Sequence, residues 1–221
     1  MRVCDATRIV VAVLCTALAG CATSRSEISL GSFAITPSTS SVTKDRTVFV
    51  RSVIDERVFE QAPRDPSTPS LGFEGAAQAS AEIKARAIGR KRNTFGQALG
   101  DILLEDGQTV TAVIRENLAT ALKQAGYRVT GNAAETGQSP LIMDVRIKQF
   151  WAWFQPGFWA IMLNTKIATN LEVSGFTAPM ILSVHAQESR QFGGDAAWIE
   201  IVNKALQAYQ TEVVAKAVHL P

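Results

Sequence analysis

The fold is decided by residues 141–173, which read LIMDVRIKQFWAWFQPGFWAIMLNTKIATNLEV. Apolar and polar side chains alternate through both halves of this stretch, and a period of two is typical of a half-buried β-strand. Gln155-Pro156-Gly157 lies between the halves and indicates a turn. We therefore expect two long neighbouring strands, followed by a third at residues 180–190. The apolar face expected for the first strand consists of Leu141, Met143, Val145, Ile147, Trp151 and Trp153.

Two segments outside this meander have the period of an amphipathic α-helix. In the first, which ends at Ala125, apolar residues recur every three or four positions, with Asp106 or Thr109 as the expected N-cap and Gly126 after the last turn. The second begins close to residue 195, with Asp195 as its expected N-cap. Its expected buried stripe consists of Trp198, Ile201, Val202, Ala205, Tyr209, Val213 and Ala217.

The remaining segments complete a fold of the α+β class. The stretch from Arg46 to Ile54 (RTVFVRSVI) is rich in β-branched residues and predicts a first strand. Residues 60–80 contain three prolines and two glycines and predict a long loop, of a kind that is either functional or disordered. The order strand, helix, strand meander, helix predicts an α+β domain over residues 46–221, in which two main helices pack on one face of an antiparallel (mixed) sheet.

The first 21 residues have the pattern of a lipoprotein signal peptide. Two arginines precede the apolar run IVVAVLCTAL, which is too short to span a bilayer, because a transmembrane helix needs roughly 20 residues. Leu18, Ala19, Gly20 and Cys21 then resemble a lipobox, the recognition site of lipoprotein signal peptidase. We expect residues 1–20 to be removed and Cys21 to carry a diacylglyceryl group and an N-acyl chain such as palmitate. The alternative is an ordinary secreted protein with a chance cysteine.

The segment after the lipobox bears on location. Residue 22 is alanine, and by resemblance to other lipoproteins a non-acidic residue here favours the periplasmic face of the outer membrane over the inner membrane. Residues 21–45 are rich in Ser and Thr and predict a tether. Ile28, Leu30, Phe33 and Ile35 could form a short edge strand inside it. Cys4 and Cys15 precede the cleavage site, so we expect the mature domain to have no free thiol.

Composition argues against several classes of function. The formal net charge of +2 is too small to indicate nucleic-acid binding. The chain has two histidines, His185 and His219, so we expect no histidine-rich metal site and no cofactor besides the lipid. No nucleophile elbow, phosphate loop or paired-carboxylate motif stands out, so we expect a protein that is not an enzyme. The alternative is a hydrolase in which His185 acts with a carboxylate and a hydroxyl group.

Four cations, Arg86, Arg90, Lys91 and Arg92, lie in one short stretch of the sequence. They could contact anionic envelope material such as phospholipid headgroups, lipid phosphates or peptidoglycan carboxylates. The alternative is a solvated hairpin end, because blocks of like charge usually lie at the surface.

An aromatic stretch, FWAWFQPGFW, occupies residues 150–159. Alternation places Trp151 and Trp153 on one face of the strand and Phe150 and Phe154 on the other. Either a helix or the long loop covers the second face, or that face contacts a membrane or a partner protein. The candidate contact residues are Phe150, Trp151, Trp153, Phe154, Phe158 and Trp159.

Several segments carry a resemblance to a known family. They are Val48-Phe49-Val50, Ile88-Gly89-Arg90-Lys91-Arg92-Asn93, Gly100-Asp101-Ile102-Leu103-Leu104, Leu122-Lys123-Gln124-Ala125-Gly126-Tyr127 and the final helix. With the lipobox and the order of elements, they resemble the YajG-like family of uncharacterised bacterial lipoproteins, over roughly residues 21–218. The resemblance implies a location and a fold; it implies no catalytic residue and no ligand.

The sequence therefore predicts a membrane-anchored periplasmic lipoprotein that acts as a non-enzymatic binding or scaffolding module of the cell envelope. The expected partners are the membrane, through the lipid, and an envelope protein, peptidoglycan or lipid; we expect no nucleic acid. The alternative is an auxiliary lipoprotein subunit of an envelope lipid-transport or assembly machine, with a lipid-binding groove between sheet and helices.

Overall fold

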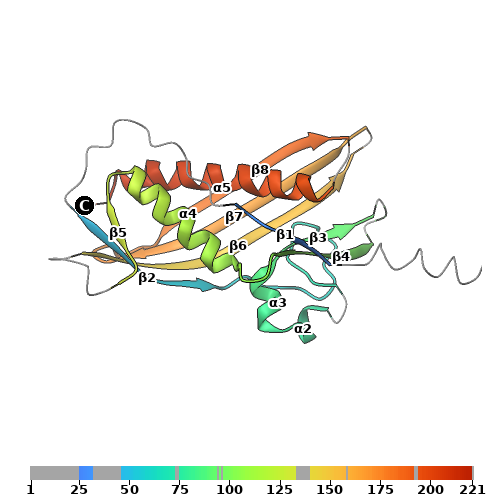
Figure 1. Ribbon diagram of the computed structural model, residues 1–221, viewed down its shortest axis with the longest axis horizontal. Helices are drawn as coiled ribbons and strands as arrows, with labels where there is room; N and C mark the ends of the chain where they lie inside the picture. Colours follow the sequence, from blue (N-terminus) through green and yellow to red (C-terminus); the bar gives the residue numbers. More distant parts are fainter. Residues whose placement is uncertain are drawn as a thin grey trace, which may run out of the picture.

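The computed structural model describes residues 25–31, 46–72, 75–93, 95, 97–132, 140–157, 159–191 and 194–220. Two long helices lie on one face of an eight-stranded mixed sheet, which confirms the predicted α+β class (Figure 1). The strands are β1 (Ser26–Ile28), β2 (Thr47–Asp55), β3 (Ala87–Arg92), β4 (Ala98–Leu104), β5 (Arg128–Thr130), β6 (Leu141–Pro156), β7 (Ile161–Val173) and β8 (Met180–Arg190). The helices are α2 (Gly75–Gln78), α3 (Ala81–Arg86), α4 (Val110–Gln124) and α5 (Asp195–Ala217).

Strand β6 is the centre of the sheet. On one edge it pairs with β7 along most of its length, and β7 pairs with β8, both antiparallel, so the predicted meander is confirmed. The other edge of β6 is shared by two groups of strands. Strand β2 runs parallel to its first half and carries β5, while β3 contacts it at Ala152 and carries β4 and β1.

The alternation predicted for β6 is interrupted by one extra residue. The register of β6 against β7 shifts between Ile147 and Gln149, so Lys148 forms a bulge. A bulge reverses which face each following side chain occupies. Residues 141–147 at odd positions therefore face the helices, whereas Trp151 and Trp153 face the opposite side of the sheet. The prediction that all these residues share one face is wrong for the two tryptophans.

The ends of both long helices follow from local sequence. The Thr109 hydroxyl accepts a hydrogen bond from the Ala112 amide at 3.2 Å and caps α4, and Gly126 has a φ of +91°, as its position after the helix requires. The N-cap of α5 is Gly194 rather than the predicted Asp195, which is the first helical residue. There its negative charge still stabilises the positive end of the helix dipole.

The main core lies between the sheet and the two long helices. All seven residues of the predicted α5 stripe are buried in it. Phe154 of β6 stacks on Trp198 of α5 with ring centroids 3.9 Å apart. The Tyr127 hydroxyl donates to the carbonyls of Ala217 and Leu220, both at 3.1 Å, and so attaches the end of the chain to the strand that follows α4.

A smaller second core lies on the opposite face of β6. The Trp151 indole nitrogen donates to the Pro66 carbonyl at 3.1 Å, and Phe59 meets the Trp151 ring edge to face. The segment predicted as a long loop at residues 60–80 thus covers this face, with a bridge between Glu60 and Ser70 and a short helix, α2. The buried residues of the second core are Leu71, Ala79, Ala87, Leu103, Trp151 and Trp153.

Part of the predicted tether belongs to the sheet. Residues Ser26–Ile28 form the parallel edge strand β1 beside β4, and Ile28 and Leu30 are buried. Of the four residues predicted to form a short edge strand, Ile28 lies in β1 and Leu30 lies just after it, while Phe33 and Ile35 lie outside the described residues. None of the helices among the described residues has the length and apolar character needed to cross a bilayer.

Candidate functional site

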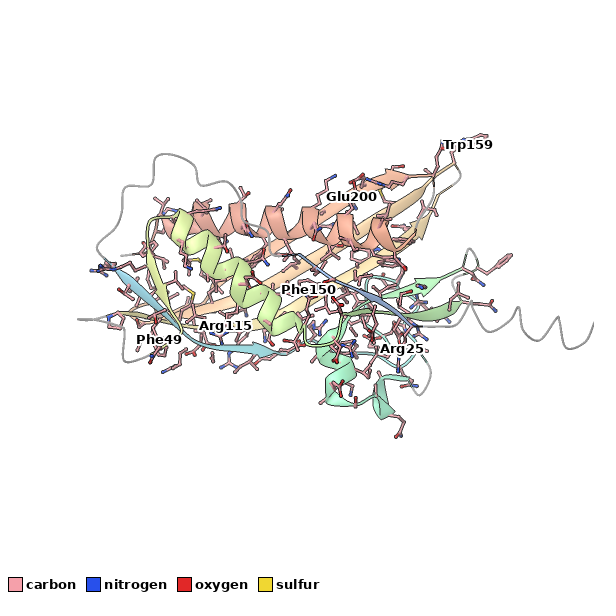
Figure 2. All side chains as sticks on the ribbon, in the orientation of Figure 1. Arg25, Phe49, Arg115, Phe150, Trp159 and Glu200 are labelled. Carbon is pink, nitrogen blue, oxygen red and sulfur yellow. The ribbon has the colours of Figure 1, made fainter. Side chains whose placement is uncertain are left out.

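The long strands of the sheet define two ends of the molecule. Arg25, at the start of β1, and Trp159, in the turn between β6 and β7, lie at one end of the molecule (Figure 2). We call this the anchor end; the turn between β3 and β4 lies there too (Figure 1). The turn between β7 and β8 lies at the other end. Because β7 has 13 residues, each rising about 3.3 Å, roughly 40 Å separates the two ends.

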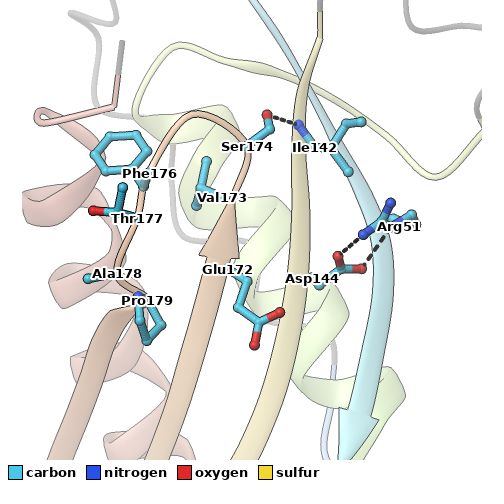
Figure 3. A pocket seen from close by; sticks show the side chains of 10 residues that line it. All are labelled: Arg51, Ile142, Asp144, Glu172, Val173, Ser174, Phe176, Thr177, Ala178 and Pro179. Atoms are coloured by element: carbon cyan, nitrogen blue, oxygen red, sulfur yellow. Dashed lines mark hydrogen bonds and ion pairs between the residues drawn. The ribbon is translucent and has the colours of Figure 1, made fainter.

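A pocket of about 440 Å³ opens at the end away from Arg25, and we call it the distal pocket (Figure 3). It is formed where the turn after β7 meets the first residues of β6 and the middle of β2. The Ser174 hydroxyl accepts a hydrogen bond from the Ile142 amide at 2.9 Å and fixes one wall. The lining residues are Arg51, Ile142, Asp144, Glu172, Val173, Ser174, Phe176, Thr177, Ala178 and Pro179.

An ion pair between neighbouring strands forms the polar wall of the distal pocket. The Arg51 guanidinium of β2 donates two hydrogen bonds to the Asp144 carboxylate of β6, one of them from Nε at 3.1 Å (Figure 3). The Ser52 hydroxyl donates to the same carboxylate at 2.5 Å. The hydrogen bonds from Arg51 hold the pKa of Asp144 below its ordinary value, although partial burial opposes the shift. Asp144 is therefore a carboxylate at neutral pH and accepts rather than donates.

The ion pairs continue along the open face of the sheet. Arg146 donates to Glu172, which lines the pocket, at 2.7 Å and to Glu56 at 2.5 Å. Lys148, the bulged residue, donates to the other oxygen of Glu56, also at 2.5 Å. The hydrogen bonds from Lys148 and Arg146 lower the pKa of Glu56. Opposite charges thus balance one another in this row, and exposed pairs of this kind stabilise a fold only slightly.

Two exposed apolar side chains lie beside the balanced charges. Phe176, in the wall of the distal pocket, is 44% exposed, and Ile181, at the start of β8, is 60% exposed. Apolar side chains surrounded by polar groups are typical of a surface that contacts another protein. Sequence reasoning missed this site, because Arg51 and Asp144 are 93 residues apart and no local pattern links them.

The predicted basic patch does not exist as one surface. Arg86 is buried; its Nε donates to the Leu104 carbonyl at 2.9 Å and its Nη2 to the Glu27 carboxylate at 2.5 Å. It therefore joins β1 to the end of β4 and is a structural residue. The four cations are separated because Arg86 ends α3, whereas the others lie on β3, not in a hairpin turn.

The three cations of β3 have different surroundings. Arg90 lies opposite the buried Asp101 in the ladder between β3 and β4, and burial lowers its pKa while Asp101 opposes that shift. The Lys91 ammonium donates to the Ser26 hydroxyl of β1. Arg92 donates to the Pro63 carbonyl at 3.3 Å. Lys91 and Arg92 are half-buried and immediately precede the turn at the anchor end.

The predicted aromatic contact patch is largely core. Phe150 and Trp151 have no exposed surface and Trp153 is 7% exposed, because helices cover one face of β6 and residues 59–86 cover the other. As candidates for contact with a partner these three residues are wrong, and Phe154 is stacked on Trp198. Trp159 alone among the described residues of this stretch is a strongly exposed aromatic, at 86%. Phe158 lies outside the described residues.

His185 has amide and aromatic neighbours on the outer face of β8. Its Nε2 lies 3.1 Å from the Asn164 amide oxygen, which also accepts from Gln187 at 3.0 Å, and its ring stacks on Trp153. Burial, with help from Lys166, lowers its pKa. The imidazole therefore contacts an amide and an aromatic ring, whereas the predicted hydrolase alternative placed a carboxylate and a hydroxyl group beside it. Among the residues that the structure describes, no cluster of His, Cys, Asp and Glu could hold a metal ion.

A cavity of about 80 Å³ lies where β1 and its following residues meet α4 and α5. Leu30, Val113 and Leu206 are among its lining residues. Pockets for drug-sized ligands have volumes of roughly 300 Å³ or more, so this cavity is too small for an acyl chain. It does not supply the groove that direct handling of lipid would require.

The predicted lipidation site, Cys21, and its recognition residues Leu18, Ala19 and Gly20 lie outside the described residues. The described chain begins at Arg25, whose Nε donates to the fully buried Asp101 carboxylate at 3.2 Å. Asp101 also accepts from the Gly72 amide at 2.7 Å. Four residues of extended chain span at most about 14 Å, so a lipid on Cys21 would lie close to this end of the sheet.

No family model matches the chain, and no curated protein matches it. Among solved structures, a protein from Xanthomonas campestris of the family DUF330 aligns with a TM-score of 0.48 and 12% identity over 89% of this chain and 94% of its own. An uncharacterized protein aligns with a TM-score of 0.42 and 13% identity over 90% of this chain and 99% of its own. A lipoprotein from Neisseria meningitidis aligns with a TM-score of 0.26 and 12% identity over 44% of this chain and 85% of its own. The resemblance to the YajG-like family stays a prediction.

Proposed function

We propose that this chain is a lipid-anchored, non-enzymatic binding module of the bacterial cell envelope, held at the periplasmic face of the outer membrane by lipids on Cys21. The observation that supports this most is the position of Arg25. Its ion pair with the buried Asp101 brings the fold to within four residues of Cys21, while the distal pocket opens at the opposite end.

The anchor chemistry accounts for stable attachment. Each buried methylene of an acyl chain contributes about 0.8 kcal/mol, and a single chain gives only reversible binding, whereas two or three chains on one cysteine give stable anchoring. Attachment next to β1 then fixes which end of the sheet lies near the bilayer. The distal pocket, roughly 40 Å away along β7, is presented to the aqueous compartment.

The chemistry of the distal pocket suits a protein partner. Its charges are already paired within the chain, as in Arg51 with Asp144 and Arg146 with Glu172. A small charged ligand would have to displace these pairs, whereas a protein surface can cover them and bury the exposed Phe176 and Ile181. We therefore place the partner contact at this end rather than at the buried aromatic stretch.

The test is a comparison of partners captured from the envelope. Full-length tagged protein is cross-linked in cells and purified, for the wild type, for a Phe176→Ser, Ile181→Ser variant and for a Gln207→Ser control on the exposed side of α5. Loss of the same cross-linked proteins in the pocket variant and their retention in the control are expected. Equal partners in all three preparations would contradict a contact at the distal pocket.

A further inference from the structure

Two turns at the anchor end each expose one large aromatic side chain. Trp159, in the turn from β6 to β7, is 86% exposed, and Phe95, in the turn from β3 to β4, is 88% exposed. Figure 2 shows Trp159 at the tip of its hairpin, beyond the body of the sheet. Tryptophan in particular is enriched at membrane–water interfaces, because its ring is apolar and its N–H group can still meet water.

The beginning of the fold lies at the same end. Arg25 is four residues from Cys21, which sets a maximum of about 14 Å between the lipid-bearing residue and the start of β1. Strand β1 pairs with β4, and β4 begins directly after the turn that carries Phe95. A lipid anchored in a bilayer at Cys21 therefore brings this end of the domain, and not the distal pocket, against the membrane surface.

We infer that the anchor end rests on the phospholipid bilayer itself, with Trp159 and Phe95 inserted at the boundary between headgroups and acyl chains. This inference rests on the proposed lipid at Cys21. The two turns and the lipid then form three separate points of contact, so the domain is held in one orientation instead of rotating about a single tether. The distal pocket consequently faces away from the membrane.

The basic side chains next to the turn with Phe95 suit contact with a phospholipid surface. Lys91 and Arg92 are the last two residues of β3 before the turn with Phe95, and neighbouring residues of a strand point to opposite faces of the sheet. The two cations therefore flank the sheet on either side of β3. Basic side chains beside a membrane are attracted to anionic headgroups, so an acidic phospholipid would strengthen the contact.

The four tryptophans of the chain make this contact measurable. Trp151, Trp153 and Trp198 are buried, so Trp159 is the residue that lipids can reach. The lipidated full-length protein is reconstituted into vesicles of phosphatidylethanolamine and phosphatidylglycerol, with or without bromine on the acyl chains. We expect brominated lipids to remove the part of the emission that comes from Trp159, and we expect the lipidated Trp159→Phe variant to show no loss.

Two further variants sharpen the result. Phe95→Ala should reduce the loss of emission, because one of the two turns no longer inserts, whereas Phe176→Ala, at the distal pocket, should leave it unchanged. Iodide quenching of the non-lipidated Cys21→Ser protein in detergent-free buffer checks the fold. With Trp159 present, part of the tryptophan emission should be accessible to iodide. With Trp159→Phe added to Cys21→Ser, that accessible part should be absent.

The outcomes separate this inference from the proposed function. Intact mass shows whether wild-type Cys21 carries lipid; its absence overturns the proposed anchor. If the lipid is present and brominated vesicles leave the wild-type emission unchanged, or quench Trp159→Phe equally, the membrane contact of the anchor end is overturned while the anchor stands. If a partner protein, and not the bilayer, covers this end in the cell, the vesicles should also leave the emission of Trp159 unchanged, because they contain no such protein.

Discussion

Arg25 and Asp101, 76 residues apart in the sequence, form an ion pair with 3.2 Å between Nε and Oδ2. The carboxylate is fully buried and also accepts from the amide of Gly72. It therefore holds together three separate parts of the chain: the strand that follows the predicted lipidation site, the segment that covers the second core, and strand β4. This buried acid is thus one of the contacts that join the segments meeting at the anchor end.

Asp101→Asn is expected to destabilise the fold by about 3 kcal/mol, because removal of a buried charge leaves its partner uncompensated. The value lies at the low end of the usual range, since Arg25 is partly exposed. Urea unfolding of the Cys21→Ser protein measures it. Glu105→Gln, at an exposed position one residue beyond β4, should change stability by no more than about 0.5 kcal/mol.

Arg57→Met is expected to loosen the cover of the second core. The fully buried guanidinium donates to the carbonyls of Ala87, Phe150 and Lys84 at 2.5, 3.1 and 2.7 Å and pairs with Asp55. Methionine retains the bulk but leaves these acceptors without a donor, which should cost about 3 kcal/mol. Calorimetry on both proteins checks this, and an unchanged midpoint of thermal unfolding would contradict it.

Trp151→Phe should free the segment that covers β6. The substitution removes the hydrogen bond to the Pro66 carbonyl and part of a fully buried side chain, at a cost of about 1–2 kcal/mol. Limited proteolysis should then cut within residues 60–72 faster than in the wild type, because local opening exposes the backbone. Trp159→Phe, at an exposed site, is the matched control and should be cut at the wild-type rate.

The ion pair of the distal pocket predicts a dependence of stability on pH. Hydrogen bonds from Arg51 make the pKa of Asp144 lower in the folded protein than in the unfolded chain, where it is about 3.9. The stabilisation is therefore complete above that value and is lost as the pH falls through the lower, folded-state pKa. Acid unfolding of Asp144→Asn should show a shallower loss of stability below pH ~4 than the wild type. Parallel curves for the two proteins would show that the pair contributes nothing.

The sequence predicted the elements whose pattern is local. The meander of β6 to β8, the cap at Thr109 and the buried stripe of α5 all depend on residues close together in the chain, and each is confirmed. Strands β3 and β4 were not predicted, because glycines and charges interrupt their apolar residues and the strands exist through their pairing.

The candidate sites were harder to predict because burial is decided by distant parts of the chain. Lys148 adds one residue to β6, and the resulting bulge turns Trp151 and Trp153 towards the second core. The alternation of apolar and polar residues in the sequence does not reveal this bulge. Arg86 has the charge of a surface residue, yet it is buried, because its guanidinium donates hydrogen bonds to the Glu27 carboxylate and the Leu104 carbonyl. Trp159 was named from the sequence, but only the fold shows that it lies at the end where the chain enters the sheet.

The fate of Cys21 decides whether the proposed lipid anchor exists. Wild type and Cys21→Ser are expressed with a C-terminal tag, membranes are separated into inner and outer fractions, and the intact mass of each protein is measured. We expect that wild type begins at Cys21, carries the mass of its acyl chains and sediments with the outer membrane, whereas Cys21→Ser does not. If both proteins have no added lipid and partition alike, the anchor, and with it the orientation of the domain, is contradicted.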